Sequence, residues 1–395
     1  MSAPRHLVMV TRVLPHHSIG GMQAVAWDLA TEFVRQGVAV TVLTAAIPGR
    51  PERFTDSGVQ IRALRGTAWQ HYGRQWWRTT RRVFEDELLS KCDLVFSISA
   101  GGFGLLPLQF RAPKLPFVLQ AHGTSIGEII SKWRSRSLRG ILTSARNIGW
   151  ITKDLVAYGK FDTIVTVGRR VAIDFDIWPI THCVDKSRLR LIPNGIDTRI
   201  FFPNPGARIR LRRKLGWGDD FHVVASIGRL HKQKGVDLGL DAIALLAKET
   251  GKVRYLVVGD GPESHALIAK TKQMDLSGLV HFTGGVARER IADYLNAADT
   301  MLFATRRVEG NPLNILEALS VGLPVIASGH LSQTVPPSEQ IVLVNQNNAA
   351  EVASALKSTF DRKPYRSNFL PPGFSLAESA TAYLALFDDL IVRRH

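Results

Sequence analysis

Short apolar runs alternate with longer amphipathic runs along almost the whole chain. The apolar runs have the length of buried strands, and the runs between them have the spacing of helices. Strands that alternate with helices predict parallel βαβ units, and therefore an α/β fold with helices on both faces of each sheet. The expected strands are His6–Thr11, Val38–Thr44, Leu94–Ser97, Phe117–Gln120, Thr163–Val167, Val223–Ile227, Arg254–Val258, Val280–Phe282, Thr300–Phe303 and Val325–Ala327.

The length of 395 residues exceeds one typical hydrophobic core and predicts two domains. The break is expected between Pro193–Asp197 and Pro203–Gly206, where prolines and glycines concentrate. The expected domains are residues 1–200, which should bind the acceptor, and residues 201–375, which should bind the donor. Residues 376–395 contain a last helical pattern, Leu376–Val392, which can pack on either domain or cross back to the first. Two Rossmann-like domains facing across a cleft are the simplest arrangement, with ligands at the carboxyl ends of the strands.

The cysteine content and the apolar runs of the sequence predict the cellular compartment. Cys92 and Cys183 offer no disulfide framework and no metal-ligand spacing, which is typical of a reducing compartment. The first residues lack the apolar core and cleavage site of a signal peptide. No run approaches the ~18 apolar residues of a membrane-spanning helix. We therefore expect a cytoplasmic protein, soluble or peripheral on the inner face of the membrane.

The segment EGNPLNILEALSVGLPVIAS, from Glu309 to Ser328, predicts a loop, a helix and a buried strand. Asn311 is a good N-cap and Pro312 suits the first helical position, which places Glu309 in the loop and Glu317 inside the helix. A helix N-terminus suits an anionic ligand, and a carboxylate further along the helix suits a sugar hydroxyl. Together they predict a site for a nucleotide sugar, which carries a diphosphate between hydroxyl-bearing groups.

A basic loop, Gly228–Gly235, follows the expected strand Val223–Ile227 at the edge where a ligand should bind. Arg229 can hold phosphate oxygens in a bidentate manner, and Lys234 adds a point charge. The glycine spacing differs from that of a Walker loop. A solvated basic loop is the alternative interpretation, but the glutamate-bearing segment downstream favours diphosphate binding.

Two features of the first half are weaker signals. Gly20-Gly21 opens the helix expected at Met22–Gln36, where adjacent glycines let the backbone approach a phosphate. His122 follows the strand Phe117–Gln120, a position that favours a role at the reacting sugar over a purely structural one. Asp174-Phe175-Asp176 matches the DxD pattern of Mn²⁺-dependent transferases. No third ligand is near in sequence, so we interpret it as a chance match and expect no metal and no cofactor.

In their order along the chain, these residues resemble the retaining glycosyltransferases of the GT-B fold, family 4. The PNGID run at Pro193–Asp197, the turn Gly259–Glu263 and the segment Phe282–Gly284 add to the resemblance. It covers most of the chain up to Ser328. Beyond that residue, the family's Gly-Gly-x-x-Glu turn is replaced by Gly329–Gln333.

The resemblance implies a role for each matching residue. Arg229 and Lys234 would hold the donor diphosphate, Glu317 would bind the ribose hydroxyls, and Glu309 would face the anomeric centre. The remaining implied contacts are the backbone N–H groups of Leu313, Asn314 and Ile315 and the glycine Gly21 at the phosphates, His122 at the donor sugar, and Phe282 near the base.

The resemblance also implies an activity. A sugar would pass from a UDP- or GDP-linked donor to a sugar or lipid-linked acceptor, with retention and without a metal ion. Glu309, His122, Arg229 and Lys234 would be the catalytic residues. Synthesis of cell-envelope polysaccharide, lipopolysaccharide or glycolipid is the expected setting. The alternatives are a sugar-nucleotide epimerase or phosphorylase of the same fold, a transferase with a small soluble acceptor, and an inactive scaffold.

The basic charge is concentrated in the first half of the chain. Residues 1–200 hold 27 Lys and Arg against 15 Asp and Glu (+12), and residues 201–395 hold 23 against 19 (+4), for a total of +16. No nucleic-acid-binding motif accompanies this charge, so we expect no nucleic acid and instead peripheral contact with an anionic membrane. An ordinary amphipathic helix is the alternative. The signals are a seven-residue basic repeat and a cluster of tryptophan and arginine: Lys132, Arg139, Arg146, Lys153 and Lys160; Trp69, Trp76, Trp77, Arg78, Arg81 and Arg82.

Overall fold

The computed structural model describes residues 6–18, 20–134, 149–307, 309–361 and 367–394. The chain forms two compact units. Unit 1 comprises Met1–Gly195 together with Ser375–His395, and unit 2 comprises Ile196–Phe374. The chain therefore changes unit at Gly195 rather than at residue 200, and the closing helix belongs to unit 1.

Unit 1 is built on an eight-stranded sheet, in the order β3-β4-β2-β1-β5-β6-β7-β8 within the described residues. All neighbouring strands are parallel except β3 and β4, which form an antiparallel hairpin at one edge. The bounds are β1 His6–Val10, β2 Ala39–Ala45, β3 Arg53–Asp56, β4 Val59–Leu64, β5 Leu94–Ile98, β6 Phe117–Ala121, β7 Thr163–Thr166 and β8 Leu189–Leu191.

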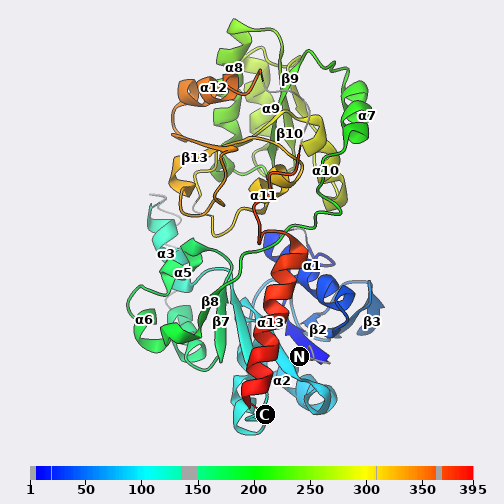
Figure 1. Cartoon of the computed structure of the whole chain (residues 1–395), viewed down its shortest axis with the longest axis vertical. Helices are drawn as coiled ribbons and strands as arrows, with labels where there is room; N and C mark the ends of the chain where they lie inside the picture. Colours follow the sequence, from blue (N-terminus) through cyan, green and yellow to red (C-terminus); the bar gives the residue numbers. More distant parts are fainter. Residues whose placement is uncertain (1–5, 19, 135–148, 308, 362–366, 395) are drawn as a thin grey trace. The chain divides into compact units, whose positions relative to one another are not determined.

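Helices cover both faces of this sheet. On one face, α1 (Gly21–Arg35) lies beside α13 (Leu376–Arg394), and the rings of Phe33 and Phe387 are 5.8 Å apart (Figure 1). The other face carries α2 (Arg74–Glu87), the 3₁₀ segment Ser99–Phe110 and helical residues 149–158, which share one apolar core. The shorter helices are α3 (Ser125–Arg134), α5 (Arg169–Asp174) and α6 (Ile180–Cys183).

The tryptophans of α2 belong to this core and not to a surface cluster. Trp76 is 2% exposed and donates from its indole nitrogen to a backbone carbonyl at 3.0 Å. Trp77 stacks on Tyr72 at 5.3 Å. The expected basic–aromatic surface is therefore wrong for Trp76, whose ring fills the space beneath α2, whereas Trp69 and Trp77 are half-buried against the same core. Arg78 and Arg82 remain exposed on the outer side of the helix.

The seven-residue basic repeat is described only in part. Lys132, Arg139 and Arg146 lie outside the residues whose side chains are described. Lys153 and Lys160 are exposed, the first on helical residues 149–158 and the second just after them. Within the described ranges, no helix combines the length and the apolarity that a bilayer span requires.

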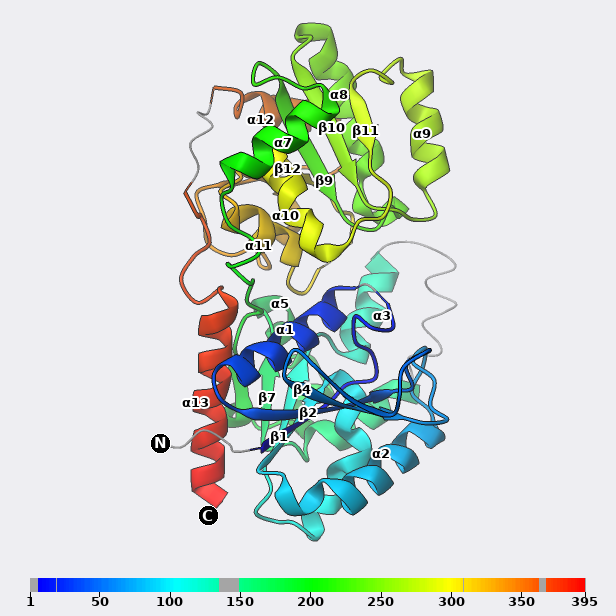
Figure 2. The ribbon, with the colours of Figure 1, turned by 90° about the vertical axis from the view of Figure 1, so that its right-hand side faces the viewer.

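Unit 2 contains a fully parallel six-stranded sheet, in the order β11-β10-β9-β12-β13-β14 within the described residues. Its strands are β9 His222–Ile227, β10 Val253–Val258, β11 Val280–Phe282, β12 Thr300–Phe303, β13 Val325–Ser328 and β14 Ile341–Val344. Helices lie on both faces of this sheet (Figure 2). Each face has its own apolar core. One core contains side chains of α10 and α11, and the other those of α8, α9 and α12: α8 Val236–Glu249, α9 Ser264–Gln273, α10 Arg288–Ala297, α11 Leu313–Ser320, α12 Ala349–Lys357.

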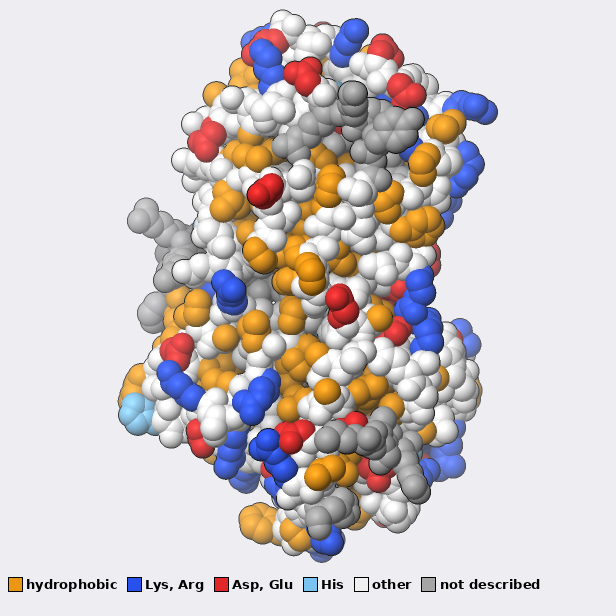
Figure 3. Space-filling model, viewed as in Figure 1, with side chains coloured by type: hydrophobic (Ala, Val, Ile, Leu, Met, Phe, Trp, Pro, Cys, Tyr) orange, Lys and Arg blue, Asp and Glu red, His pale blue; other side chains and the backbone are white. Residues whose placement is uncertain are grey.

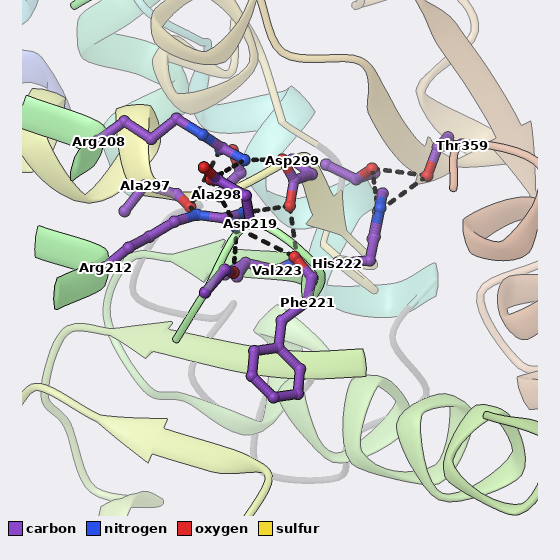
Figure 4. Close-up of polar contacts among 12 residues, drawn as sticks. Arg208, Arg212, Asp219, Phe221, His222, Val223, Ala297, Ala298, Asp299 and Thr359 are labelled. Carbon is purple, nitrogen blue, oxygen red and sulfur yellow. Dashed lines mark hydrogen bonds and ion pairs between the residues drawn. The ribbon is translucent and has the colours of Figure 1, made fainter. Parts of the chain in front are cut away.

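A buried polar network fixes α7 (Pro205–Leu215) to the amino edge of this sheet (Figure 4). Asp299, just before β12, pairs with Arg208 at 2.8 Å and with Arg212, and accepts the Val223 N–H at 2.8 Å. Burial acts to raise the pKa of Asp299, but the two arginine charges outweigh it and keep that pKa below its usual value. The network is at the opposite edge from the carboxyl ends of the strands and holds the frame on which the site is built.

Candidate functional site

The loop between β9 and α8 leaves the carboxyl edge of the unit 2 sheet with its basic residues in two environments. Arg229 is exposed and has no hydrogen bond or ion pair among the described residues. Lys234 ends a single 3₁₀ turn, Lys232–Lys234, and its side chain is 26% exposed. Gly235 follows with φ 71°, and a Cβ there would lie 1.9 Å from Ala304 O. Only glycine fits at this position, because the loop passes close to the backbone just after β12. This close contact fixes the position of Lys234.

Lys234 meets one of the two glutamates of the Glu309–Ser328 segment. Its Nζ lies 2.7 Å from Glu309 Oε1 and 5.4 Å from the centre of the Phe303 ring. The Glu309 side chain is 17% exposed. A half-buried ion pair of this kind is worth more than one in open solvent, because water screens it less. The structure therefore brings together two residues that are 75 positions apart in sequence.

The helix α11 begins one residue later than the sequence suggested. Its N-cap is Pro312 with no side-chain capping bond, so the expected N-cap at Asn311 is wrong. Pro312 has no N–H to leave unpaired, and it therefore suits the cap as well as the first turn. The Asn314 side chain donates to Ile227 O at 3.0 Å and ties the start of α11 to the end of β9.

The first N–H groups of α11 differ in availability. The N–H of Ile315 donates to Pro312 O at 3.0 Å. Those of Leu313 and Asn314 have no backbone acceptor in the described part of the chain. The positive end of the helix dipole adds to these two donors. The backbone N–H groups of Leu313 and Asn314 are therefore available to a ligand, whereas that of Ile315 already has an acceptor.

Glu317 lies one turn further along α11 and is 5% exposed. Arg288, at the first position of α10, places a guanidinium nitrogen 3.9 Å from Glu317 Oε1. A buried carboxylate needs such a charge or hydrogen-bond donors to stay ionised. Sequence reasoning missed Arg288. The signal that could have pointed to it is an arginine at the start of a helix that closely follows the Phe282–Gly284 segment.

Three turns meet at this edge of the sheet. Phe282 ends β11 and is half-buried against the core on the α8 side. Beside it, the Gly259 N–H donates to Gly284 O at 3.1 Å. A Cβ on Gly259, whose φ is 130°, would lie 2.0 Å from Gly228 O. The turns after β9, β10 and β11 are thus in contact, as the carboxyl ends of adjacent parallel strands require.

Gly21 and His122 belong to unit 1, at the carboxyl ends of β1 and β6. Gly21 is the first residue of α1 and is exposed. His122 Nε2 lies 2.9 Å from Gln120 Oε1, and Gln120 Nε2 donates to the hydroxyl of Tyr383 on α13 at 2.8 Å. Burial lowers the pKa of His122 to about 4, so the ring is neutral at pH 7. The Gln120 oxygen accepts from Nε2–H, which leaves Nδ1 as an acceptor.

The DxD residues have other partners. Asp174 pairs with Arg170 at 2.9 Å and accepts from Thr124 at 3.2 Å, whereas Asp176 pairs with Lys186 at 2.6 Å. The two carboxylates therefore make separate ion pairs within unit 1. Over the described ranges, no group of three or more His, Cys, Asp or Glu side chains is placed to hold a metal ion.

Two family models match successive parts of the chain. Glycosyltransferase Family 4 matches residues 19–200, and Glycosyl transferases group 1 matches residues 207–371. The chain belongs to glycosyltransferase family 4. The unit 2 residues assembled above all lie inside the second match, and Gly21 and His122 lie inside the first.

Similar proteins include enzymes with different acceptors. The family 4 chain is 31% identical over 219 residues to a GDP-mannose-dependent alpha-(1-6)-phosphatidylinositol monomannoside mannosyltransferase from Mycobacterium tuberculosis, which covers 51% of this chain and 57% of that protein. The match thus spans little more than half of the relative. A D-inositol 3-phosphate glycosyltransferase from Nocardioides sp. is 25% identical over 381 residues, covering 88% and 79%. The structure of a sucrose-phosphate synthase from Thermosynechococcus elongatus matches with TM-score 0.76 and 18% identity, covering 98% and 100%, which shows the GT-B fold.

Proposed function

We propose that this family 4 protein transfers a sugar from a UDP- or GDP-linked donor to a sugar or lipid-linked acceptor, with retention of configuration and without a metal ion. The observation that carries the proposal is the convergence on one sheet edge of the Lys234–Glu309 pair, the open N–H groups at the start of α11, and the buried Glu317. Cations and N–H donors suit a diphosphate, and a carboxylate one turn further along suits the ribose hydroxyls.

Charge separation explains how this arrangement would accelerate the reaction. As the bond between the anomeric carbon and the phosphate breaks, negative charge grows on the departing diphosphate. The N-terminus of α11 would stabilise that charge without having to reorganise, which is where preorganised groups contribute most, and Lys234 and Arg229 would add positive charge. Glu309 would face the positive charge that develops on the sugar. Retention would follow if the acceptor attacks on the face from which the phosphate leaves, with the phosphate as base.

The relatives bear on the chemical class of the acceptor. The names of the two relatives described above refer to phosphatidylinositol monomannoside and D-inositol 3-phosphate. They support an acceptor that is either a lipid-linked or a soluble polyol or sugar, as in glycolipid, lipopolysaccharide or other cell-envelope glycan synthesis. A sugar-nucleotide epimerase of the same fold is the second candidate, because the donor-binding residues would serve it equally. Gly21 and His122 stay predictions from the family resemblance.

Peripheral contact with the anionic inner face of the membrane is part of the proposal. Unit 1 contains the basic half of the chain, and Phe110, at the end of its 3₁₀ segment, is 89% exposed beside Arg111, which is 76% exposed in its side chain. On the face drawn in Figure 3, Lys and Arg side chains are scattered among apolar and uncharged ones. Cosedimentation with phosphatidylglycerol and with phosphatidylcholine vesicles tests this. Equal pelleting with both, or no effect of Phe110→Ser, would remove the membrane from the proposal.

The donor is tested by differential scanning fluorimetry against UDP, GDP and ADP sugars. A ligand at about 100 times its Kd should stabilise the protein by about 2.7 kcal/mol. We expect a shift with one nucleotide class that is about half as large in Glu317→Gln, as a roughly tenfold weaker affinity implies. No shift with any of them would contradict the nucleotide-sugar assignment. With the donor in hand, conversion of the donor sugar without an acceptor would favour the epimerase.

A further inference from the structure

Arg12 lies just after β1, at the carboxyl end of the unit 1 sheet. Its side chain is half-buried, and its guanidinium carbon lies 4.5 Å from the centre of the Tyr72 ring. Tyr72 is in the loop between β4 and α2, which leaves the same edge of the sheet because β4 runs parallel to β2 and β1. The two residues therefore come from separate loops that meet at the edge where α/β sheets bind ligands.

The charge of Arg12 has no partner among the described residues. Its guanidinium makes no hydrogen bond or ion pair there, and its Nε is buried without an acceptor. Burial lowers the pKa of Arg12, which reflects the cost of keeping the charge away from water. Most other half-buried arginines of this chain have carboxylates, such as Arg62 with Glu87 at 2.9 Å. A half-buried charge without a counter-charge carries part of this desolvation cost, so its position points to an anion that is supplied by a ligand.

Aromatic rings and a second cation adjoin Arg12. Tyr72 contacts Trp150, with ring centres 5.9 Å apart at 61°. Lys153 places its Nζ 4.2 Å from the centre of the Trp150 ring, and no ion pair of Lys153 is found among the described residues. We call Arg12, Tyr72, Trp150 and Lys153 the aromatic–basic cluster. It presents two cations on two rings that touch each other.

The alternative interpretation is that these are cation–π contacts whose role is only to stabilise unit 1. Such contacts account for the stacking of Arg12 on Tyr72, since a guanidinium over a ring is favourable. They leave the in-plane N–H groups of Arg12 without acceptors, because a ring satisfies charge above its face and not the hydrogen-bond donors at the guanidinium edge. Those donors have the fork geometry that matches two oxygens of a phosphate or a carboxylate.

We propose that the aromatic–basic cluster binds a phosphate carried by the acceptor, with Arg12 as its principal ligand. The rings of Tyr72 and Trp150 would contact the apolar face of the attached sugar or polyol. This inference rests on the proposed function, because it names the chemical class of the acceptor for the same reaction. The phosphate belongs either to a soluble phosphorylated sugar or polyol, or to the headgroup of an anionic lipid.

The test compares ligands that differ only in the phosphate. Trp fluorescence titrations with UDP or GDP present would use glucose 6-phosphate against glucose, and myo-inositol 1-phosphate against myo-inositol. Phosphatidylcholine nanodiscs with phosphatidylinositol or with diacylglycerol form the lipid arm. The proteins are wild type, Arg12→Gln, and Arg78→Gln as a matched control, since Arg78 is an exposed arginine of the same unit. Nucleotide affinity is measured separately in each sample.

In one arm we expect wild type and Arg78→Gln to bind the phosphorylated ligand about tenfold or more tightly than the neutral ligand. The neutral ligand lacks the charge-assisted hydrogen bonds of the phosphate, and the loss of one such bond accounts for a difference of this size. Arg12→Gln should remove this preference and leave nucleotide affinity unchanged. The arm that shows the preference identifies the source of the phosphate. No preference in wild type, in either arm, would overturn the inference, as would a preference that survives in Arg12→Gln. Failure of nucleotide binding in wild type would instead overturn the proposed function.

Discussion

The buried hydroxyl of Tyr383 connects the last helix of the chain to His122, and removing it tests that connection. Tyr383 on α13 is fully buried and accepts from Gln120 Nε2 at 2.8 Å, and Gln120 Oε1 pairs with His122 Nε2 at 2.9 Å. Tyr383→Phe keeps the ring, which packs 5.2 Å from that of Phe96, and deletes only the oxygen. The change therefore isolates one hydrogen bond and creates almost no cavity.

The expected magnitude follows from the burial of Gln120, which is 0% exposed. Without the hydroxyl, the Gln120 amide N–H has no acceptor, and an unsatisfied buried donor costs about 1–3 kcal/mol. For a domain of 150–250 residues, each kcal/mol lowers Tm by about 2–4 °C. We therefore expect unit 1 of Tyr383→Phe to melt about 2–12 °C below wild type. Because the Gln120 amide is then free to turn over, the tautomer of His122 is no longer fixed, and kcat/KM should fall about tenfold, which corresponds to about 1.4 kcal/mol.

Tyr255→Phe is the matched control. Tyr255 in unit 2 is also fully buried, and its hydroxyl donates to Ser226 at 2.8 Å, with no link to His122. Scanning calorimetry and initial rates with the donor found by fluorimetry would be measured on both variants. Similar losses of stability are expected in the two units, with the larger loss of kcat/KM in Tyr383→Phe. Equal effects of the two variants on kcat/KM would refute the connection between Tyr383 and His122.

Four further results follow from the site and its frame. Lys234→Ala should lower kcat/KM by an amount equivalent to roughly 2–4 kcal/mol, whereas Lys232→Ala, on the same turn but exposed, should not; equal effects would exclude a specific role. Glu317→Gln should weaken nucleotide diphosphate binding about tenfold in isothermal titration, and an unchanged Kd would rule out the ribose contact. The pKa of His122 is lowered to about 4 in the folded protein and is near 6.5 in the unfolded chain. The free energy of unfolding should therefore be highest above pH 6.5 and fall by up to about 3 kcal/mol as pH falls toward 4, because the unfolded chain then binds a proton that the buried ring does not. Urea unfolding of unit 1 at several pH values should show this decline, and His122→Asn should flatten it. Asp299→Asn should destabilise unit 2 by about 3–5 kcal/mol in urea unfolding, because it leaves buried arginines unpaired, and a loss below 1 kcal/mol would contradict that account.

Most strands that carry the site could be predicted from the sequence because both of their faces are buried. Such strands have continuous apolar runs, and the expected Thr300–Phe303 agrees with β12 residue for residue. The expected Val280–Phe282 also agrees with β11, although β11 is an edge strand whose residues are half-buried or exposed. The strand β3, Arg53–Asp56, was missed because it is an edge strand whose residues alternate between exposed and half-buried. An edge strand needs no apolar run, so composition gives no signal for it.

The polar contacts of the site could not be predicted from the sequence, because they join residues that are far apart along the chain. A motif can place Lys234 and Glu309 at the same sheet edge, but their 2.7 Å contact depends on how two separate loops pack. The same holds for Arg288 beside Glu317, and for Tyr383 behind His122, where the partners are 29 and 261 positions apart by residue number. Periodicity and propensity are local, whereas these contacts are set by tertiary packing.

The Lys234–Glu309 pair has a consequence for the order of events in the proposed reaction. In the structure each group neutralises the other, so the half-buried edge carries little net charge there. A diphosphate brings more negative charge than one carboxylate and would compete with Glu309 for Lys234. As Lys234 turns to the phosphate, Glu309 would lose its counter-charge just where the sugar acquires positive charge. The carboxylate would then be least compensated at the moment when it can stabilise the transition state most, which is the differential binding that catalysis requires.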